Sequence, residues 1–198
     1  MKTRDILRLS GHPSSKRSVD ELNQRLPGLD GRAIRIRFLP ALSAGSRKLY
    51  SRRSYGQPVF AGTFIRKRRI VLDLELVGKR NELVRILTHE LFHFAWVRLG
   101  NQSRRTYEDL LHREWRQRAR GELGWSAESR KLGLSHNLHP TTHHPRKWRD
   151  YACESFCDTA AWLYSGIARH PEFTLAPRHR KRRAEWFCAT FHGRRIPI

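Results

Sequence analysis

The stretch RILTHELFHFAW, residues 85–96, decides how the rest of this chain is interpreted. It places His89 and His93 four residues apart, with Glu90 directly after the first histidine. The other positions are nearly all apolar, and the apolar residues of 81–99 follow the period of a helix that a glycine then closes. A helix that is apolar on every side is typical of a protein interior, where two histidines and a glutamate are costly without partners.

A metal ion would satisfy all three polar residues. Side chains four apart on a helix share one face, so the imidazoles of His89 and His93 can bind the same ion. Glu90 projects to an adjacent face, from which it can reach a metal-bound water without being a ligand itself. Zinc lowers the pKa of such a water, and a carboxylate can accept its proton. The spacing therefore predicts one catalytic Zn²⁺ with Glu90 as general base; the alternative is a hydrogen-bonded histidine pair in an ordinary buried helix.

A catalytic zinc ion needs a third protein ligand, and two residues compete for this role. In WRDYACESFCDTAAWLY (148–164), Glu154 and Asp158 lie four apart on an expected helix that is otherwise rich in apolar residues. Glu154 could bind the metal while Asp158 accepts the ring N–H of a ligand histidine; otherwise both belong to a surface stripe paired with arginines. The second candidate is His112 in DLLHREWRQRARGELG (109–124), which is otherwise an exposed histidine on an amphipathic helix.

Hydrolysis also needs a group that stabilises the oxyanion, the negatively charged oxygen of the transition state, and several residues are candidates. Tyr151, one turn before Glu154, is one candidate transition-state stabiliser. The others are the four histidines of the Pro- and His-rich segment 133–148, which reads as a loop: His136, His139, His143 and His144.

Cysteine content and the absence of a long apolar run indicate where the protein works. The three cysteines form no disulfide framework, and the odd number suits a reducing compartment. Cys153 and Cys157, four apart on one expected helix, are interpreted as small buried core residues. The N-terminus has no secretory signal pattern and no segment has transmembrane length, so we expect a cytoplasmic protein without membrane contact.

Hydrophobic periodicity predicts three strands before the helix of 81–99 and mostly helices after it. The expected strands are 32–40, 58–65 and 68–76, with 41–57 as an irregular connection, and the later helices are 104–120, 148–165 and 178–192. This order predicts an α+β fold: a small, mostly antiparallel sheet of about three strands packed on the active-site helix, followed by a helical C-terminal half. We expect a single domain, 1–198, with a basic, partly helical lead-in (1–31), a catalytic core (58–165) and a basic C-terminal helix (177–198).

The net charge of +22 is concentrated at the two ends of the chain. Residues 1–70 carry 17 Lys and Arg against 4 Asp and Glu, and residues 177–198 carry 7 against 1. Residues 71–176 are nearly balanced, with 16 against 13. A basic surface attracts nucleic acid or another polyanion, although the run RHRKRR (178–183) has few interleaved aromatics and could be a solvated face.

The HELFH motif in a buried helix resembles the HExxH signature of the zincin metallopeptidases. The ESFCD spacing resembles the gluzincin subgroup, in which a downstream helix supplies a Glu ligand followed four residues later by an Asp. The resemblance covers residues 58–165 and implies His89, His93 and Glu154 as ligands, Glu90 as general base and Asp158 as the partner of a ligand histidine. It also implies that the strand 68–76 lines the cleft and pairs with an extended peptide.

A second resemblance is to the SprT-like proteases, intracellular enzymes associated with DNA–protein crosslinks. HREWRQRARGELG is similar to their third-ligand region, which makes His112 the third ligand. The chain departs from that pattern because Arg113 stands where a Gly is usual and no cysteine zinc ribbon follows. We therefore predict a minimal gluzincin-like zinc metallopeptidase acting on a peptide or protein. The alternatives are a SprT-like protease acting on nucleic-acid-bound proteins and a nucleic-acid-binding protein with a non-catalytic metal site.

Overall fold

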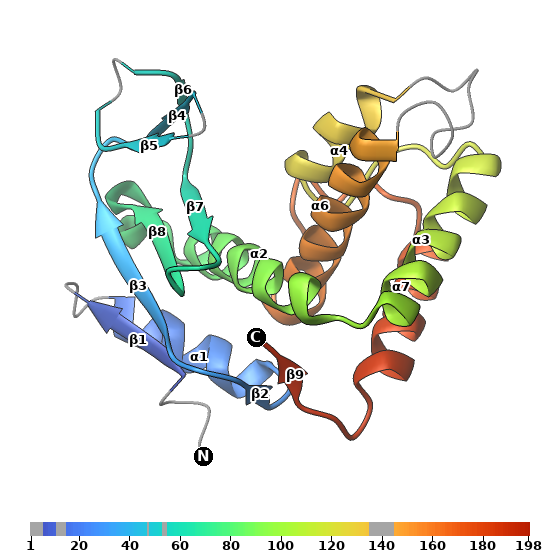
Figure 1. The fold of residues 1–198 in the computed structure, drawn as a ribbon, viewed down its shortest axis with the longest axis horizontal. Helices are drawn as coiled ribbons and strands as arrows, with labels where there is room; N and C mark the ends of the chain where they lie inside the picture. The colour runs from blue at the N-terminus through green and yellow to red at the C-terminus, as the bar shows by residue number, and fades with distance from the viewer. Residues whose placement is uncertain (1–5, 11–14, 47, 53–54, 135–144) are drawn as a thin grey trace.

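The long helix α2 (Arg80–Arg98) separates a sheet on one side from a group of helices on the other (Figure 1). The computed structural model describes residues 6–10, 15–46, 48–52, 55–134 and 145–198. Most apolar residues of α2 are buried, Leu87, Leu91 and Phe94 completely, because the sheet and the long helix α6 (Pro145–Tyr164) cover different sides of it. The helix expected over 81–99 is therefore confirmed, together with its interior position.

The sheet beside α2 has four strands in the order β1-β3-β8-β7. Their bounds are Leu7–Ser10 for β1, Ile34–Leu39 for β3, Arg69–Asp73 for β8 and Ala61–Phe64 for β7. The first three strands run parallel, and β7 joins β8 as an antiparallel hairpin through a basic turn at 66–68. As a result β8 is an inner strand, and β7 lies at one edge of the sheet, with β1 at the other.

The α+β class is confirmed, but the strand directions in this sheet differ from the expectation of a mostly antiparallel arrangement. Part of the difference arises in the segment 1–31, which was expected to be a basic, partly helical lead-in. It supplies β1, and helix α1 (Lys16–Arg25) then leads the chain back toward β3. Parallel neighbours need such a crossover connection, usually a helix.

The strand expected over 68–76 ends at Asp73. The Asp73 carboxylate accepts hydrogen bonds from the backbone N–H of Leu42 at 2.7 Å and of Glu75 at 2.9 Å. The second bond caps a short 3₁₀ helix, η3 (Leu74–Gly78), which redirects the chain toward α2. An aspartate cap therefore ends the strand inside an apolar alternation that would otherwise continue it.

The segment 41–57, expected to be irregular, instead forms most of a small antiparallel sheet in the order β5-β4-β6. Its strands are Ser43–Gly45 (β4), Lys48–Tyr50 (β5) and Gln57–Pro58 (β6), so the strand expected over 58–65 is split between β6 and β7. Gly56 has a φ of 84°, and a Cβ there would lie 2.2 Å from the carbonyl oxygen of Ala44. The close pairing therefore depends on a glycine rather than on hydrophobic alternation.

The C-terminal half is helical, as expected. It contains α3 (Asn101–Arg116), α4 (Trp125–Leu132), α6 and α7 (Pro177–Phe191), of which only α4 was not expected. After α7 the chain returns to the N-terminal segment, where β9 (Ile196–Pro197) pairs in parallel with β2 (Leu29–Asp30). The main core cluster extends from Ile6 to Ile198. None of the helices in the described parts of the chain is long and apolar enough to cross a membrane.

Candidate metal centre

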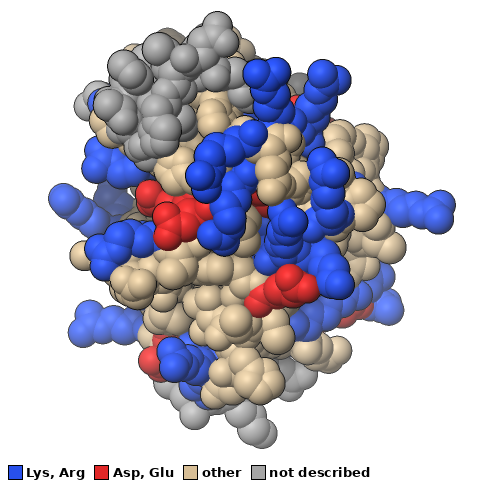
Figure 2. Space-filling model, turned by 90° about the vertical axis from the view of Figure 1, so that its right-hand side faces the viewer, with Lys and Arg blue, Asp and Glu red and all other residues tan. Residues whose placement is uncertain are grey.

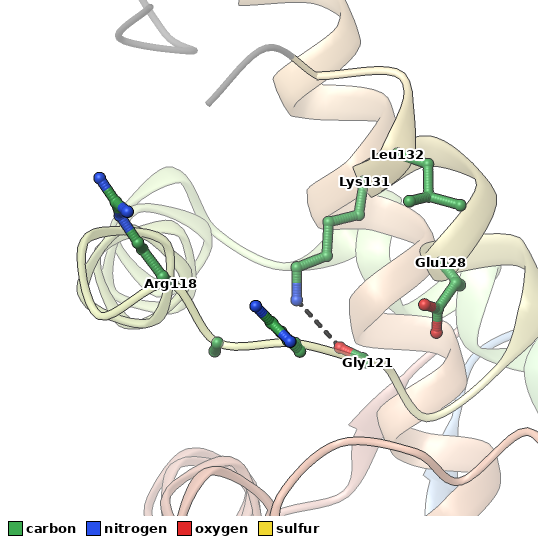
Figure 3. Close-up of a pocket in the computed structure, with 7 residues that line it drawn as sticks. Arg118, Gly121, Glu128, Lys131 and Leu132 are labelled. Carbon is green, nitrogen blue, oxygen red and sulfur yellow. Dashed lines mark hydrogen bonds between the residues drawn. The ribbon is translucent and has the colours of Figure 1, made fainter. Parts of the chain in front are cut away.

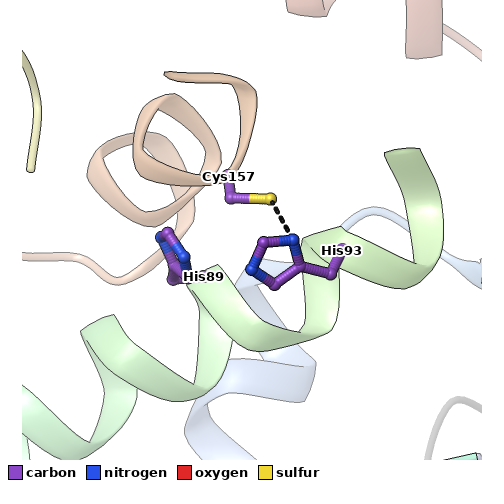
Figure 4. A group of neighbouring side chains, drawn as sticks. All are labelled: His89, His93 and Cys157. Atoms are coloured by element: carbon purple, nitrogen blue, oxygen red, sulfur yellow. Dashed lines mark hydrogen bonds between the residues drawn. The ribbon is translucent and has the colours of Figure 1, made fainter. Parts of the chain in front are cut away.

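Helix α2 brings His89 and His93 together at the side that faces α6. Their ring centroids lie 4.9 Å apart with the planes at 82°. His89 is buried and His93 partly buried, and Figure 4 shows both rings between their own helix and α6. The spacing of four residues therefore has the expected consequence that both imidazoles face the same side.

Glu154 and Asp158 of α6 both contact His89. One carboxylate oxygen of Glu154, Oε2, lies 3.2 Å from Nε2 of His89 and 4.0 Å from Nε2 of His93. Oδ1 of Asp158 lies 2.7 Å from Nδ1 of His89. The two acids predicted from the ESFCD spacing are therefore brought to the histidine pair.

Asp158 determines which nitrogen of His89 is available. Its second oxygen accepts a hydrogen bond of 2.8 Å from the backbone N–H of Ala127, in the first turn of α4. With both oxygens acting as acceptors, Nδ1 of His89 carries the proton in this bond, and Nε2 is the nitrogen that faces Glu154. Burial alone would lower the pKa of His89, but Asp158, with Glu154 and Glu90, raises it well above its usual value.

Glu90 points away from this group toward β7. Its Oε2 accepts a 2.6 Å hydrogen bond from the hydroxyl of Thr63, which also lies 3.1 Å from the Glu90 carbonyl oxygen. The carboxylate is thus oriented beside the histidines without contacting Glu154. Thr63 gave no signal in the sequence, because only the packing of β7 on α2 brings it to Glu90.

Two cavities open beside Glu90. One, of about 370 Å³, is lined by His89, Glu90, His93 and Glu154 together with Gly62 and Thr63 of β7. The other, of about 320 Å³, is lined by His89 and Glu90 with Phe60, Ala61, Ile86 and Trp125 among its other residues. The histidines, the glutamate and the edge strand therefore share open space in which a substrate could lie.

Cys153 and Cys157 of α6 also reach this centre. Sγ of Cys153 lies 3.5 Å from Nδ1 of His93. Sγ of Cys157 lies 3.4 Å from the same nitrogen (Figure 4). The interpretation as ordinary core cysteines is therefore incomplete. The sequence contains one indication that these cysteines belong to the metal centre. In CESFC they are four residues apart, like the two histidines, and Glu154 lies between them.

Two donor sets can be formed from these residues. The first is Nε2 of His89, Nε2 of His93 and Oε2 of Glu154. In a tetrahedral zinc site with bonds of about 2.0–2.1 Å, ligand atoms lie about 3.3 Å apart; the 3.2 Å separation of Glu154 from His89 matches this value, and the 4.0 Å separation from His93 exceeds it. The second set is His89, His93 and Cys157, whose donor atoms lie within 4.8 Å of one another.

The protonation of the side chains favours the carboxylate set. Burial raises the pKa of Glu154, but the neighbouring His89 and His93 lower it to about 2, so the group is ready to bind a cation. Burial and the neighbouring Cys153 raise the pKa of Cys157 well above its usual range, so Cys157, unlike Glu154, must lose a proton before it can bind a metal. Hydrogen bonding to Cys157 and to His93 lowers the pKa of Cys153 to about 6 against the effect of burial, so the Cys153 sulfur is suited to accept Nδ1–H of His93.

Tyr151 and His112 are not brought to this centre. The Tyr151 hydroxyl donates a 2.6 Å hydrogen bond to Oε1 of Glu122 in a buried network with Arg183 and Lys131, so its assignment as transition-state stabiliser is not retained. His112 stacks on Trp148 with ring centroids 4.0 Å apart, and it lines neither cavity. The four histidines of the 133–148 segment lie outside the described residues.

Comparison with protein-family models, with curated proteins and with solved structures finds no match to this chain. Its chemistry is therefore interpreted from the geometry alone.

Proposed function

We propose that the protein is a zinc-dependent peptidase of minimal gluzincin type, with His89, His93 and Glu154 as ligands. The observation that carries this proposal is the approach of both Nε2 atoms to a single Glu154 oxygen, at 3.2 and 4.0 Å, with Asp158 bonded to the opposite side of His89. Two imidazoles and one carboxylate would leave one position of a tetrahedral zinc ion open, and the 370 Å³ cavity lined by the same residues offers space beside it. An open position distinguishes a catalytic from a structural zinc site.

A bound zinc ion would supply a water of lowered pKa and polarise the scissile carbonyl. The remaining steps belong to the protein. Glu90, oriented by Thr63, accepts a proton from the attacking water and delivers it to the leaving amine. Asp158 holds His89 in the tautomer that presents Nε2 to the metal position. Glu154 would neutralise part of the positive charge of a bound zinc ion.

The substrate class proposed is an extended peptide or a segment of a protein. β7 pairs with β8 on one side and is an edge strand of its sheet, and Ala61, Gly62 and Thr63 line the two cavities. An edge strand can add an extended chain through backbone hydrogen bonds. This role falls to β7 rather than to the stretch 68–76, since β8 is enclosed between β3 and β7.

The alternative with a non-catalytic metal site is favoured by one observation, the closeness of Cys157 to both histidines. The SprT-like alternative requires His112 as the third ligand, and its stacking on Trp148 does not support that role.

We further propose a cytoplasmic location, which rests on the three cysteines, all free in this structure.

Zinc content tests the ligand set. Elemental analysis of wild type, Glu154→Ala and His112→Ala, purified together, should give about one zinc per chain in wild type and His112→Ala and a clear loss in Glu154→Ala. Loss only in His112→Ala would establish the SprT-like ligand set instead. A wild type without zinc after reloading would refute the metal site.

Glu90→Gln tests catalysis separately from metal binding. We expect zinc content and thermal unfolding to be unchanged and hydrolysis of a peptide library to fall by about 10²–10⁴-fold, because an amide cannot accept the proton of the water. Retained hydrolysis would show that Glu90 is not the base.

A further inference from the structure

The basic run of α7 lies beside the C-terminal half of α3. The two helices are antiparallel neighbours: Arg182 donates a 3.0 Å hydrogen bond to Gln117, and Trp186, further along α7, donates to Thr106, near the start of α3. Figure 2, which views the side of the molecule formed by these helices, shows many Lys and Arg side chains and few Asp and Glu. Two segments of basic sequence thus become one surface.

Six exposed or largely exposed cations define this α3–α7 basic surface: Arg113, Arg116, Arg120, Arg178, Lys181 and Arg182. The acidic residues of the same segments do not balance them. Glu114 and Glu122 are buried and paired with Arg183, the one buried arginine of the RHRKRR run. Glu185 is exposed and lies 4.0 Å from Lys181, a distance at which an exposed pair contributes little.

The charges of this surface also oppose the dipole of α7. The first turn of α7 has no acidic residue and carries Arg178, although the N-terminal end of a helix carries partial positive charge. Like charges gathered in this way destabilise the folded chain through mutual repulsion, which a bound polyanion would relieve.

Buried ion pairs fix the helices that carry this surface relative to one another. Arg183 of α7 contacts Glu114 of α3 at 2.6 Å and Glu122 of the following loop at 2.7 Å. Lys131 of α4 reaches across to the same loop and bonds to the Gly121 carbonyl at 2.9 Å, beside a cavity of about 480 Å³ with Arg118 on its other side (Figure 3). The cations therefore project from elements that are already fixed relative to one another.

We infer that the α3–α7 basic surface binds the sugar–phosphate backbone of a double-stranded nucleic acid. Guanidinium groups match phosphate oxygens in bidentate geometry, and five of the six cations are arginines. The exposed large aromatics of the described chain, Tyr55, Phe60 and Trp125, are not among these segments, so a stacking platform for single strands is missing there. The contacts are with the backbone, and binding is independent of sequence.

This surface is separate from the candidate metal centre. Ser126, in the first turn of α4, lines both cavities of the metal centre, whereas Lys131 and Leu132 at the other end of α4 line the cavity beside the basic surface. A helix of eight residues spans about 12 Å. The inference therefore stands whether or not the protein is a peptidase.

The test is fluorescence anisotropy with a labelled DNA duplex of about 20 bp, in salt from about 50 to 200 mM. The variant R113Q/R116Q/R120Q removes three cations whose side chains have no hydrogen bond or ion pair within the described residues. We expect it to weaken binding and to reduce the slope of log K against log salt by about 3, roughly one per lost phosphate contact.

The matched control is R8Q/R35Q/R37Q, which removes the same charge from exposed positions of the neighbouring strands β1 and β3. It should leave the slope within about one of wild type, and thermal unfolding should verify that both variants are folded. Equal losses in the two variants, no duplex binding at 50 mM salt, or tighter binding to a single strand of the same length would each overturn the inference. So would binding to phosphatidylserine vesicles that the duplex does not displace.

Discussion

Asp158 shows how much one residue can do in this centre. It bonds through one oxygen to Nδ1 of His89 and through the other to the backbone of α4, and it is almost completely buried. A carboxylate behind a ligand histidine fixes the ring and makes it a stronger donor. The proposed ligand set therefore depends on Asp158 although that residue does not reach the metal position.

Asp158→Asn should weaken zinc binding by about 10–100-fold at pH 8. Because Asp158 helps to raise the pKa of His89, the wild-type site must release a proton to bind zinc, and affinity should increase as the pH rises through that pKa. In the variant the pKa falls, so the increase should occur at lower pH. Chelator competition across the pH range measures both effects; an unchanged pH profile would contradict this role.

Cys157→Ala distinguishes the two donor sets. If Glu154 is the third ligand, we expect one zinc per chain and an affinity within about tenfold of wild type, because Cys153 remains as an acceptor for Nδ1–H of His93. Loss of zinc comparable to that of Glu154→Ala would instead make Cys157 a ligand. Elemental analysis and competition with a chelator provide the comparison.

Among the elements, the short helix α4 is the one whose position bears most directly on the metal centre. Gly124 precedes its first turn, and a Cβ at that position would lie 2.3 Å from the Asp158 carboxylate. The backbone approach that lets Ala127 donate to Asp158 therefore requires a residue without a side chain. The N-terminal end of α4 and the orientation of His89 are linked through this contact.

Gly124→Ala should accordingly displace either α4 or Asp158. We expect zinc affinity to fall by at least about tenfold, since the bond between Asp158 and His89 is disturbed, and thermal stability to fall by about 1–3 kcal/mol. The control is Gly100→Ala, where a Cβ meets nothing within 4 Å and zinc affinity should be unchanged. Equal zinc affinities in the two variants would show that α4 does not hold the site.

At the scale of the whole molecule, a buried ion network joins the helices that the sequence predicts separately. Arg183 of α7 pairs with Glu114 of α3 and with Glu122, which also accepts from Lys131 of α4 and Tyr151 of α6. Burial favours the neutral acid, yet Arg183 and Lys131 lower the pKa of Glu122 to about 2. The ionised carboxylate thus connects three helices, and Arg183 links α3 to them through Glu114.

The pKa of Glu122 predicts a particular dependence on acid. Its folded pKa of about 2 lies below the ordinary value of 4.5, so its contribution is complete above pH 4.5 and is lost as the pH falls toward 2. Glu122→Gln should cost about 3–5 kcal/mol at pH 7 and flatten the decline of stability between pH 4.5 and 2. Urea unfolding at several pH values tests this, with the exposed Glu185→Gln expected to change stability by less than about 0.5 kcal/mol.

Local periodicity and residue spacing were sufficient to predict part of this structure. A spacing of about four residues predicts the central helix with His89 and His93 on one face, and it places Glu154 and Asp158 on one face of α6. Alternation with a period of two predicts the strand around Ile34 and Ile36. These features survive in any fold that buries the apolar face.

Only the tertiary structure decided which faces meet. Periodicity specifies that a helix has a face, but not what packs against it. Helix α6 therefore turns Glu154, Asp158 and both cysteines toward α2, and turns Tyr151 toward Glu122. The parallel strand β1, the short helix α4 and the joining of α3 with α7 into one basic surface likewise depend on contacts between residues far apart in the chain. Such contacts form because they complete hydrogen bonds and bury charge in pairs, and no local pattern of residues records them.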